Sequence, residues 1–129
     1  MLQRIKNQPI LFSTLWAVFI FILCATPGQY IPSLSWLELL SFDKFVHLSI
    51  FFVQCSLLFL ISIKYNQGLP FIIVYFIVAM VYGLLLELMQ ARIFSNRSAD
   101  LNDVIANTTG CVLALILFKK LKFKKKSDF

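Results

Sequence analysis

The sequence predicts an all-α membrane protein: a polytopic bundle of four transmembrane helices with both termini in the cytoplasm. Hydrophobic residues make up 60% of the 129 residues and charged residues 14%, whereas soluble domains average about 45–50% and about 25%. A chain this short cannot hide so much apolar side chain in a soluble core. The apolar residues fall into four runs, and most basic residues lie on one side of those runs.

The first two runs are bounded by recognisable helix ends. A helix needs about 20 apolar residues to cross about 30 Å of hydrocarbon. The first predicted span covers residues 9–25, because proline suits a first helical turn and Pro27-Gly28 ends the run. A signal peptide is the alternative for this run, but no clear cleavage site follows it. The second span covers residues 43–63 and closes before Lys64.

The last two runs complete a single membrane domain over residues 1–129. The third span covers residues 69–90 and the fourth covers residues 100–118. The purely apolar part of the fourth run is short, so its polar first turn is needed to reach the interface. A basic tail over residues 119–129 follows, and it is expected to contact anionic cytoplasmic lipid rather than nucleic acid.

The distribution of charge orients this bundle. The net charge is +6. With four spans, nine cations lie on the side of the termini: Arg4, Lys6, Lys64, Lys119, Lys120, Lys122, Lys124, Lys125 and Lys126. Three lie on the other side: Lys44, Arg92 and Arg97. The positive-inside rule therefore predicts cytoplasmic termini. The three cysteines all lie in apolar runs, so we expect no disulfide.

Ionisable groups inside spans are costly and are usually functional or paired. Here they gather at the predicted outer ends of three spans. Asp43 and His47 share a helical face at i,i+4, with Lys44 beside them. Glu87 and Gln90 lie near the end of the third span.

Asp100, Asp103, Asn107 and Gly110 follow one stripe of the fourth span, and Arg97 lies in the preceding loop. Each residue alone has a structural explanation, such as helix capping by Asp100. Together they predict either a functional polar pocket or a polar network that locks the helices.

The spaced motifs of this region resemble the VanZ-like family, small bacterial integral membrane proteins related to teicoplanin resistance. The matching pieces are TPGQ, DKFVH, YGLLLELMQ and NRSADLNDVIANTTG, within residues 15–117. The family's motif positions correspond to these residues: Asp43, Lys44, His47, Glu87, Gln90, Arg97, Asp103, Asn107 and Gly110. The usual second small residue of the fourth span is Ala114 here, and Ile93-Phe94-Ser95-Asn96 replaces the usual loop turn. The resemblance implies a multi-pass protein of the bacterial inner membrane.

Three functions remain open on these residues. In the first, a ligand-binding pocket formed by Asp43, Lys44, His47, Glu87, Gln90, Arg97, Asp103 and Asn107 binds a membrane lipid, a lipid-linked envelope precursor or a lipoglycopeptide. In the second, His47, Glu87 and Asp103 are catalytic in an enzyme acting on an envelope lipid. In the third, the chain is an assembly or stability factor for envelope proteins. Transport by so small a chain would require an oligomer.

The sequence contains no nucleophile or phosphate-binding motif, and we expect no cofactor and no nucleic-acid partner. No metal is assigned, because the single histidine has no second histidine at ligand spacing. A mixed site of His47 with Glu87, Asp100 and Asp103 is the weaker alternative.

Overall fold

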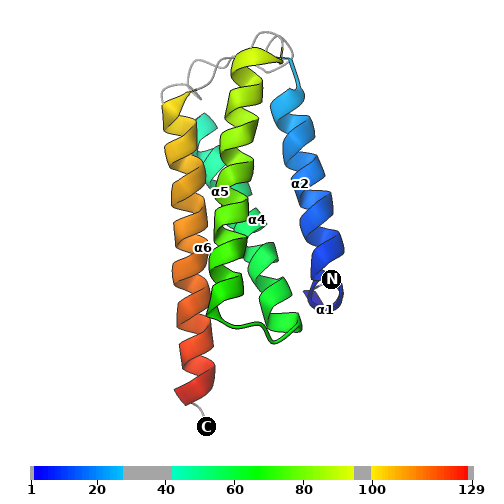
Figure 1. Cartoon of the computed structure of the whole chain (residues 1–129), viewed down its shortest axis with the longest axis vertical. Coiled ribbons are helices and arrows are strands. Elements are labelled where there is room, and N and C mark those ends of the chain that lie inside the picture. The colour runs from blue at the N-terminus through cyan, green and yellow to red at the C-terminus, as the bar shows by residue number, and fades with distance from the viewer. Residues whose placement is uncertain (1, 28–41, 95–99, 128–129) are drawn as a thin grey trace.

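The chain folds into a bundle of helices. The structure, a computed structural model, describes residues 2–27, 42–94 and 100–127. The helices of these ranges are α1 (Leu2–Asn7), α2 (Pro9–Ala25), α4 (Phe42–Lys64), α5 (Leu69–Arg92) and α6 (Leu101–Ser127) (Figure 1). The described ranges contain no strand, so the all-helical prediction is confirmed.

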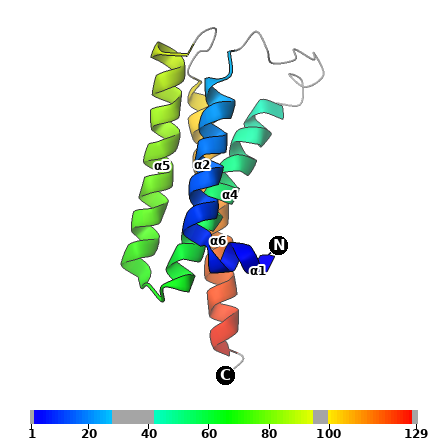
Figure 2. The same cartoon turned by 90° about the vertical axis from the view of Figure 1, so that its right-hand side faces the viewer.

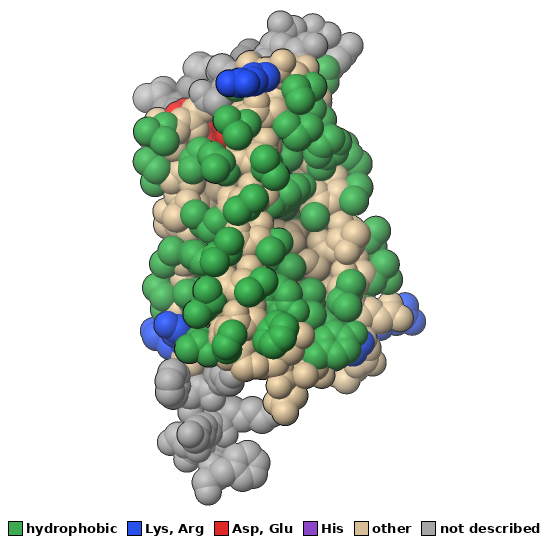
Figure 3. Space-filling model, in the orientation of Figure 1, with side chains coloured by type: hydrophobic (Ala, Val, Ile, Leu, Met, Phe, Trp, Pro, Cys, Tyr) green, Lys and Arg blue, Asp and Glu red, His purple; other side chains and the backbone are tan. Residues whose placement is uncertain are grey.

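Within the part of the chain that the structure describes, three helices are long and apolar enough to cross a membrane: α4, α5 and the Leu101–Lys120 part of α6. The fourth apolar helix, α2, has 17 residues and is therefore about 26 Å long. Many large hydrophobic side chains are exposed along the helices. On the face drawn in Figure 3 they cover the middle of the molecule, and the charged side chains lie toward its two ends. These features are those of a helical membrane protein.

Proline, glycine and asparagine set several helix ends. Pro9 and Pro70 both lie in the first turn of a helix, where a missing N–H costs no hydrogen bond. Between α4 and α5, Asn66 adopts a positive φ of 48°, a conformation that asparagine tolerates better than most residues. The helix α6, in contrast, continues for nine residues beyond residue 118, where the fourth span was predicted to end. Lysine is a good helix former and this stretch has neither glycine nor proline, so nothing stops the helix.

The centre of the bundle is α4, which contacts α2, α5 and α6, most extensively α6. Gly110 of α6 makes that contact close, since an added Cβ would overlap the carbonyl oxygen of Leu48 in α4. Buried hydrophobic side chains fill the interior, among them Ile20, Phe51 and Phe59.

Polar side chains also tie the helices together at mid-height. The Trp16 Nε1–H of α2 donates to the carbonyl of Ile50 in α4 at 2.9 Å. The Tyr82 hydroxyl of α5 donates to the carbonyl of Ala17 in α2 at 2.6 Å. These bonds fix α2 against both of its neighbours.

The two ends of the bundle differ in what they hold. The short helix α1 and the last turns of α6 lie at one end (Figures 1 and 2). At the opposite end α4 begins, α5 ends and α6 begins. The polar residues singled out in the sequence lie at this second end.

Candidate functional site

Buried polar side chains from three helices meet where α4 and α6 begin. Four of them are at least nine-tenths buried: His47, Glu87, Asp103 and Asn107. We name the polar cluster by its members: Asp43, Lys44, His47, Glu87, Asp100, Asp103 and Asn107. Burial of so many ionisable groups is costly unless each finds a partner.

Helical spacing delivers these side chains to one place. On α4, Asp43 and His47 are four residues apart and so share a face. On α6, Asp103 and Asn107 have the same spacing. Asp100 directly precedes α6 and caps it, because its Oδ1 accepts the backbone N–H of Asn102 at 2.9 Å.

Lys44 is the cation of the cluster and lies among three carboxylates. Its Nζ is 2.5 Å from Asp103 Oδ1, 2.6 Å from Asp100 Oδ2 and 3.3 Å from Asp43 Oδ2. The hydrogen bond from Lys44 is the main reason why the pKa of Asp100 lies below its usual value, and the N–H of Asn102 adds to the effect. An ammonium group donates three hydrogen bonds, so Lys44 is saturated by acids of its own chain.

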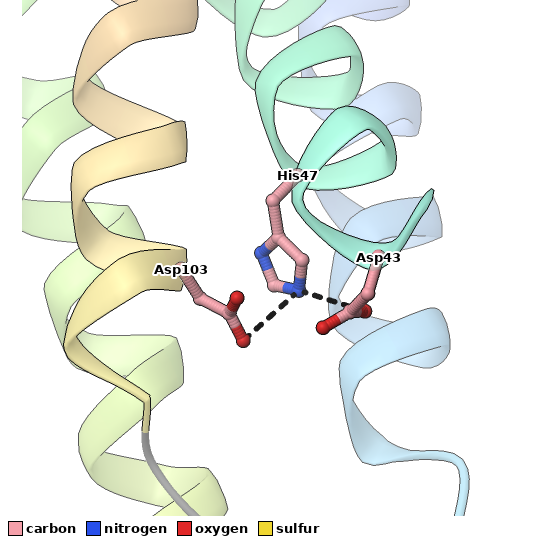
Figure 4. Close-up of side chains that lie close together, drawn as sticks. All are labelled: Asp43, His47 and Asp103. Atoms are coloured by element: carbon pink, nitrogen blue, oxygen red, sulfur yellow. Dashed lines mark ion pairs between the residues drawn. The ribbon is translucent and has the colours of Figure 1, made fainter. Parts of the chain in front are cut away.

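His47 lies at the centre of the cluster, and its two ring nitrogens face different partners. Nδ1 is 3.1 Å from Asn107 Oδ1 and 3.9 Å from Glu87 Oε1. Nε2 lies between two carboxylates, 3.8 Å from Asp43 Oδ1 and 3.6 Å from Asp103 Oδ2 (Figure 4). The imidazole thus joins α4 to both α5 and α6.

Glu87 brings α5 into the cluster and is almost completely buried, at 3% exposure. Its Oε2 accepts the backbone N–H of Asp100 at 3.4 Å. One turn earlier, Gly83 leaves room for the ring of Phe51, which an added Cβ would approach to 3.0 Å. A side chain of α4 therefore fills the space that this glycine leaves.

The structure brings together most of the residues that the sequence singled out. It unites Asp43, Lys44, His47, Glu87, Asp103 and Asn107. Gln90 is buried, but its amide donates to the carbonyl of Cys24 in α2 at 3.4 Å, so it serves another helix contact. Arg97 lies outside the described residues.

Asp100 is the residue that sequence reasoning underrated. The sequence places Asp100 in the polar stripe of the fourth span, as a possible helix cap and in the alternative metal set, but does not pair it with Lys44, which it binds in the structure. A cap has two carboxylate oxygens and uses one, so the second remains available to a neighbouring helix. An aspartate at a helix cap therefore indicates, from the sequence alone, a second oxygen that can bind a cation such as Lys44.

The cluster includes one group of side chains with the geometry of metal ligands. One ligand atom each from Asp43, His47 and Asp103 lies within 4.8 Å of the other two. The alternative set with Glu87 and Asp100 is not assembled around one nitrogen, because Glu87 faces Nδ1 and Asp100 faces Lys44.

Chemically, the site offers four carboxylates, one imidazole and one ammonium that is already bound. It is an acceptor-rich, net negative site suited to donors and cations, and its imidazole suits proton transfer. No protein-family model matches the chain, and neither a curated protein nor a solved structure matches it.

Proposed function

We propose that this chain is a VanZ-like protein of the bacterial inner membrane that spans the membrane four times. The proposal orients both termini to the cytoplasm and the polar cluster to the outside. The sequence motifs support the family, and the charge distribution supports the orientation. The position of α1 and the last turns of α6 at one end of the bundle is compatible with it.

We further propose that the polar cluster binds the head group of an amphiphile, either a lipid-linked envelope precursor or a lipoglycopeptide. The observation that carries this proposal is the convergence of three buried ionisable side chains, Glu87, His47 and Asp103, from three helices at one end of the bundle. Ionisable side chains inside a membrane protein are energetically costly unless they pair with each other or with a polar ligand. Exposed apolar helix faces next to the cluster suit the acyl chains of an amphiphile.

The charges of the cluster indicate how such a head group is recognised. Lys44 is held by acids, so it does not present a free cation to a phosphate or carboxylate. The described residues therefore favour hydroxyl, amide and ammonium groups of the ligand, which the free carboxylate oxygens accept. Direct contact with an anionic group falls to Arg97, which remains a prediction.

Binding is tested with the purified protein in nanodiscs. Teicoplanin and a polyprenyl phosphate are titrated separately into the wild type, into Glu87→Gln and into Ser56→Ala. Within the described residues the Ser56 hydroxyl donates to the carbonyl of Phe52 in its own helix and to no other helix, so Ser56→Ala is the matched control. We expect saturable binding of at least one probe to the wild type and the control, and weakening of about tenfold or more in Glu87→Gln. Absence of saturable binding, or equal binding by all three proteins, refutes the proposal.

A second function, an enzyme acting on an envelope lipid, is favoured by one observation. His47 lies against Asp43 and Asp103 on one nitrogen and Asn107 on the other, an arrangement that orients a general base. Mass spectrometry of membrane lipids from cells that express wild type or His47→Gln tests it. A lipid species that changes with His47→Gln, at equal protein abundance, supports catalysis, and identical lipid profiles refute it.

A further inference from the structure

The tautomer of His47 follows from its neighbour. With the Asn107 amide in this orientation, its Oδ1 accepts a hydrogen bond, so the 3.1 Å contact favours a proton on Nδ1. A neutral imidazole then has its lone pair on Nε2. Histidines that bind metals nearly always donate their other ring N–H to an oxygen in this manner.

That lone pair points between two carboxylates. Nε2 has Asp43 Oδ1 at 3.8 Å and Asp103 Oδ2 at 3.6 Å, and no hydrogen bond within the described residues ends on it. His47 is 7% exposed. A lone pair that faces two negative oxygens is repulsive, so a positive charge between the three atoms is favourable.

Lys44 does not supply that charge. It binds Asp43 through Oδ2 and Asp103 through Oδ1, whereas Nε2 faces the opposite oxygen of each carboxylate. Each of the two aspartates therefore has one oxygen on the lysine and one directed to the histidine. Among the described members of the cluster, Lys44 is the single permanent cation against four carboxylates, which leaves an excess of negative charge for a further cation.

We propose that Asp43 Oδ1, His47 Nε2 and Asp103 Oδ2 bind a divalent transition-metal ion of the Zn²⁺ or Mn²⁺ kind. One imidazole and two carboxylates form a donor set that both ions accept. Bonds of about 2.0–2.2 Å require the donors to approach one another by side-chain rotation, and Asp43, with a side chain 62% exposed, is the ligand free to move. Asn107 and Lys44 hold the ligands from behind, as second partners do in metal sites.

This metal would also explain how an acidic cluster meets an anionic head group. Three protein ligands leave coordination positions for water or for a ligand oxygen. A phosphate of an amphiphile could bind there and avoid the repulsion of the free carboxylates. This consequence rests on the proposed amphiphile-binding function, whereas the metal site itself does not.

The metal site is tested on tag-free protein in detergent, stripped with a chelator and then dialysed against Zn²⁺ or Mn²⁺. Bound metal is measured by elemental analysis, and affinity is measured by calorimetry. We expect stoichiometric binding to the wild type and a loss of at least tenfold in affinity in His47→Gln, Asp103→Asn and Asn107→Ala. Asp100→Asn removes the same charge as Asp103→Asn but no ligand, so it should weaken binding far less.

Folding and metal ligation are separated by a spectroscopic measurement. Co²⁺ replaces Zn²⁺ in the stripped protein, and its visible absorption reports the ligand set. We expect Co²⁺ bands in the wild type that His47→Gln shifts or abolishes while the helical circular dichroism stays the same. Equal losses in Asp100→Asn and Asp103→Asn would indicate attraction by charge alone and would overturn the proposal. Absence of metal binding to the wild type would overturn it too.

Failure of this inference is distinguishable from failure of the proposed function. Binding of teicoplanin or polyprenyl phosphate by a metal-free protein would retain the amphiphile site and reject the metal. Metal binding without binding of either probe would retain the metal site and reject the amphiphile site.

Discussion

The close crossing of α4 and α6 makes Gly110 the position where one added methyl group has the largest effect. In Gly110→Ala, the new Cβ would overlap the Leu48 carbonyl oxygen and lie 2.9 Å from the Phe52 nitrogen. Both obstacles are backbone atoms of a helix, so no rotamer change relieves the overlap. The two helices must separate by about 1 Å to restore ordinary van der Waals distances.

We expect Gly110→Ala to lower the free energy of unfolding by about 3 kcal/mol, the upper end of the overpacking range. Gly83→Ala should lower it by about 1 kcal/mol, because its Cβ meets the Phe51 ring at 3.0 Å and a ring can turn. Gly68→Ala is the control and should lie within about 0.5 kcal/mol of the wild type. Its Cβ meets only Pro70 Cδ at 3.6 Å.

The free energy of unfolding is measured by titrating sodium dodecyl sulfate into protein in dodecyl maltoside micelles. Circular dichroism follows the helices and tryptophan fluorescence follows the packing. An increase of the α4–α6 distance also pulls Lys44 from Asp103, which lie 2.5 Å apart, so ligand binding at the cluster should weaken together with stability. If Gly110→Ala unfolds at the same detergent fraction as Gly68→Ala, the close crossing inferred from the backbone distances is refuted.

Three further predictions test other parts of the fold. Trp16→Phe should lower the free energy of unfolding by about 1 kcal/mol, because the Ile50 carbonyl loses its side-chain donor; no change in the detergent titration contradicts this. Lys44 lowers the pKa of Asp100. The stabilisation that the Asp100 carboxylate provides is therefore present above the pKa of an unfolded aspartate, and it is lost as the pH falls through the lower pKa of Asp100 in the folded protein. Unfolding titrations at several acidic pH values should show this loss reduced in Asp100→Asn; an equal pH dependence contradicts it. All three thiols are buried, so a polar maleimide should label them slowly until the protein is unfolded, and fast labelling of folded protein contradicts the packing. These thiols are Cys24, Cys55 and Cys111.

Helix positions were readable from the sequence because each depends on local signals. Pro9 and Pro70 indicate helix starts, and the lengths of the apolar runs indicate the helices between them. The continuation of α6 through the lysine-rich segment was missed, since the boundary was set by hydrophobicity and helix propensity does not end there. The short helix α1 was not predicted either, because six residues before a proline carry no periodic signal.

The depth of the polar cluster was also predictable, but its pairing was not. The i,i+4 spacing of Asp43 and His47 places both on one face of a helix whatever its neighbours do. Which acid contacts Lys44 depends instead on the rotation of α4 against α6, 56 to 59 residues away in sequence. Gln90 shows the same limit, since residues three apart differ by about 60° around a helix, enough to turn its amide to α2.

The pairing of α4 with α6 has a consequence for biogenesis. The chain is synthesised from its N-terminus, so Lys44 and His47 are made before Asp103 and Asn107, their partners on α6. During that interval the start of α4 carries polar groups whose partners on α6 do not yet exist. Synthesis of α6 is thus the step that supplies these partners and completes the cluster, so a chain that ends before α6 would leave Lys44 and His47 without them.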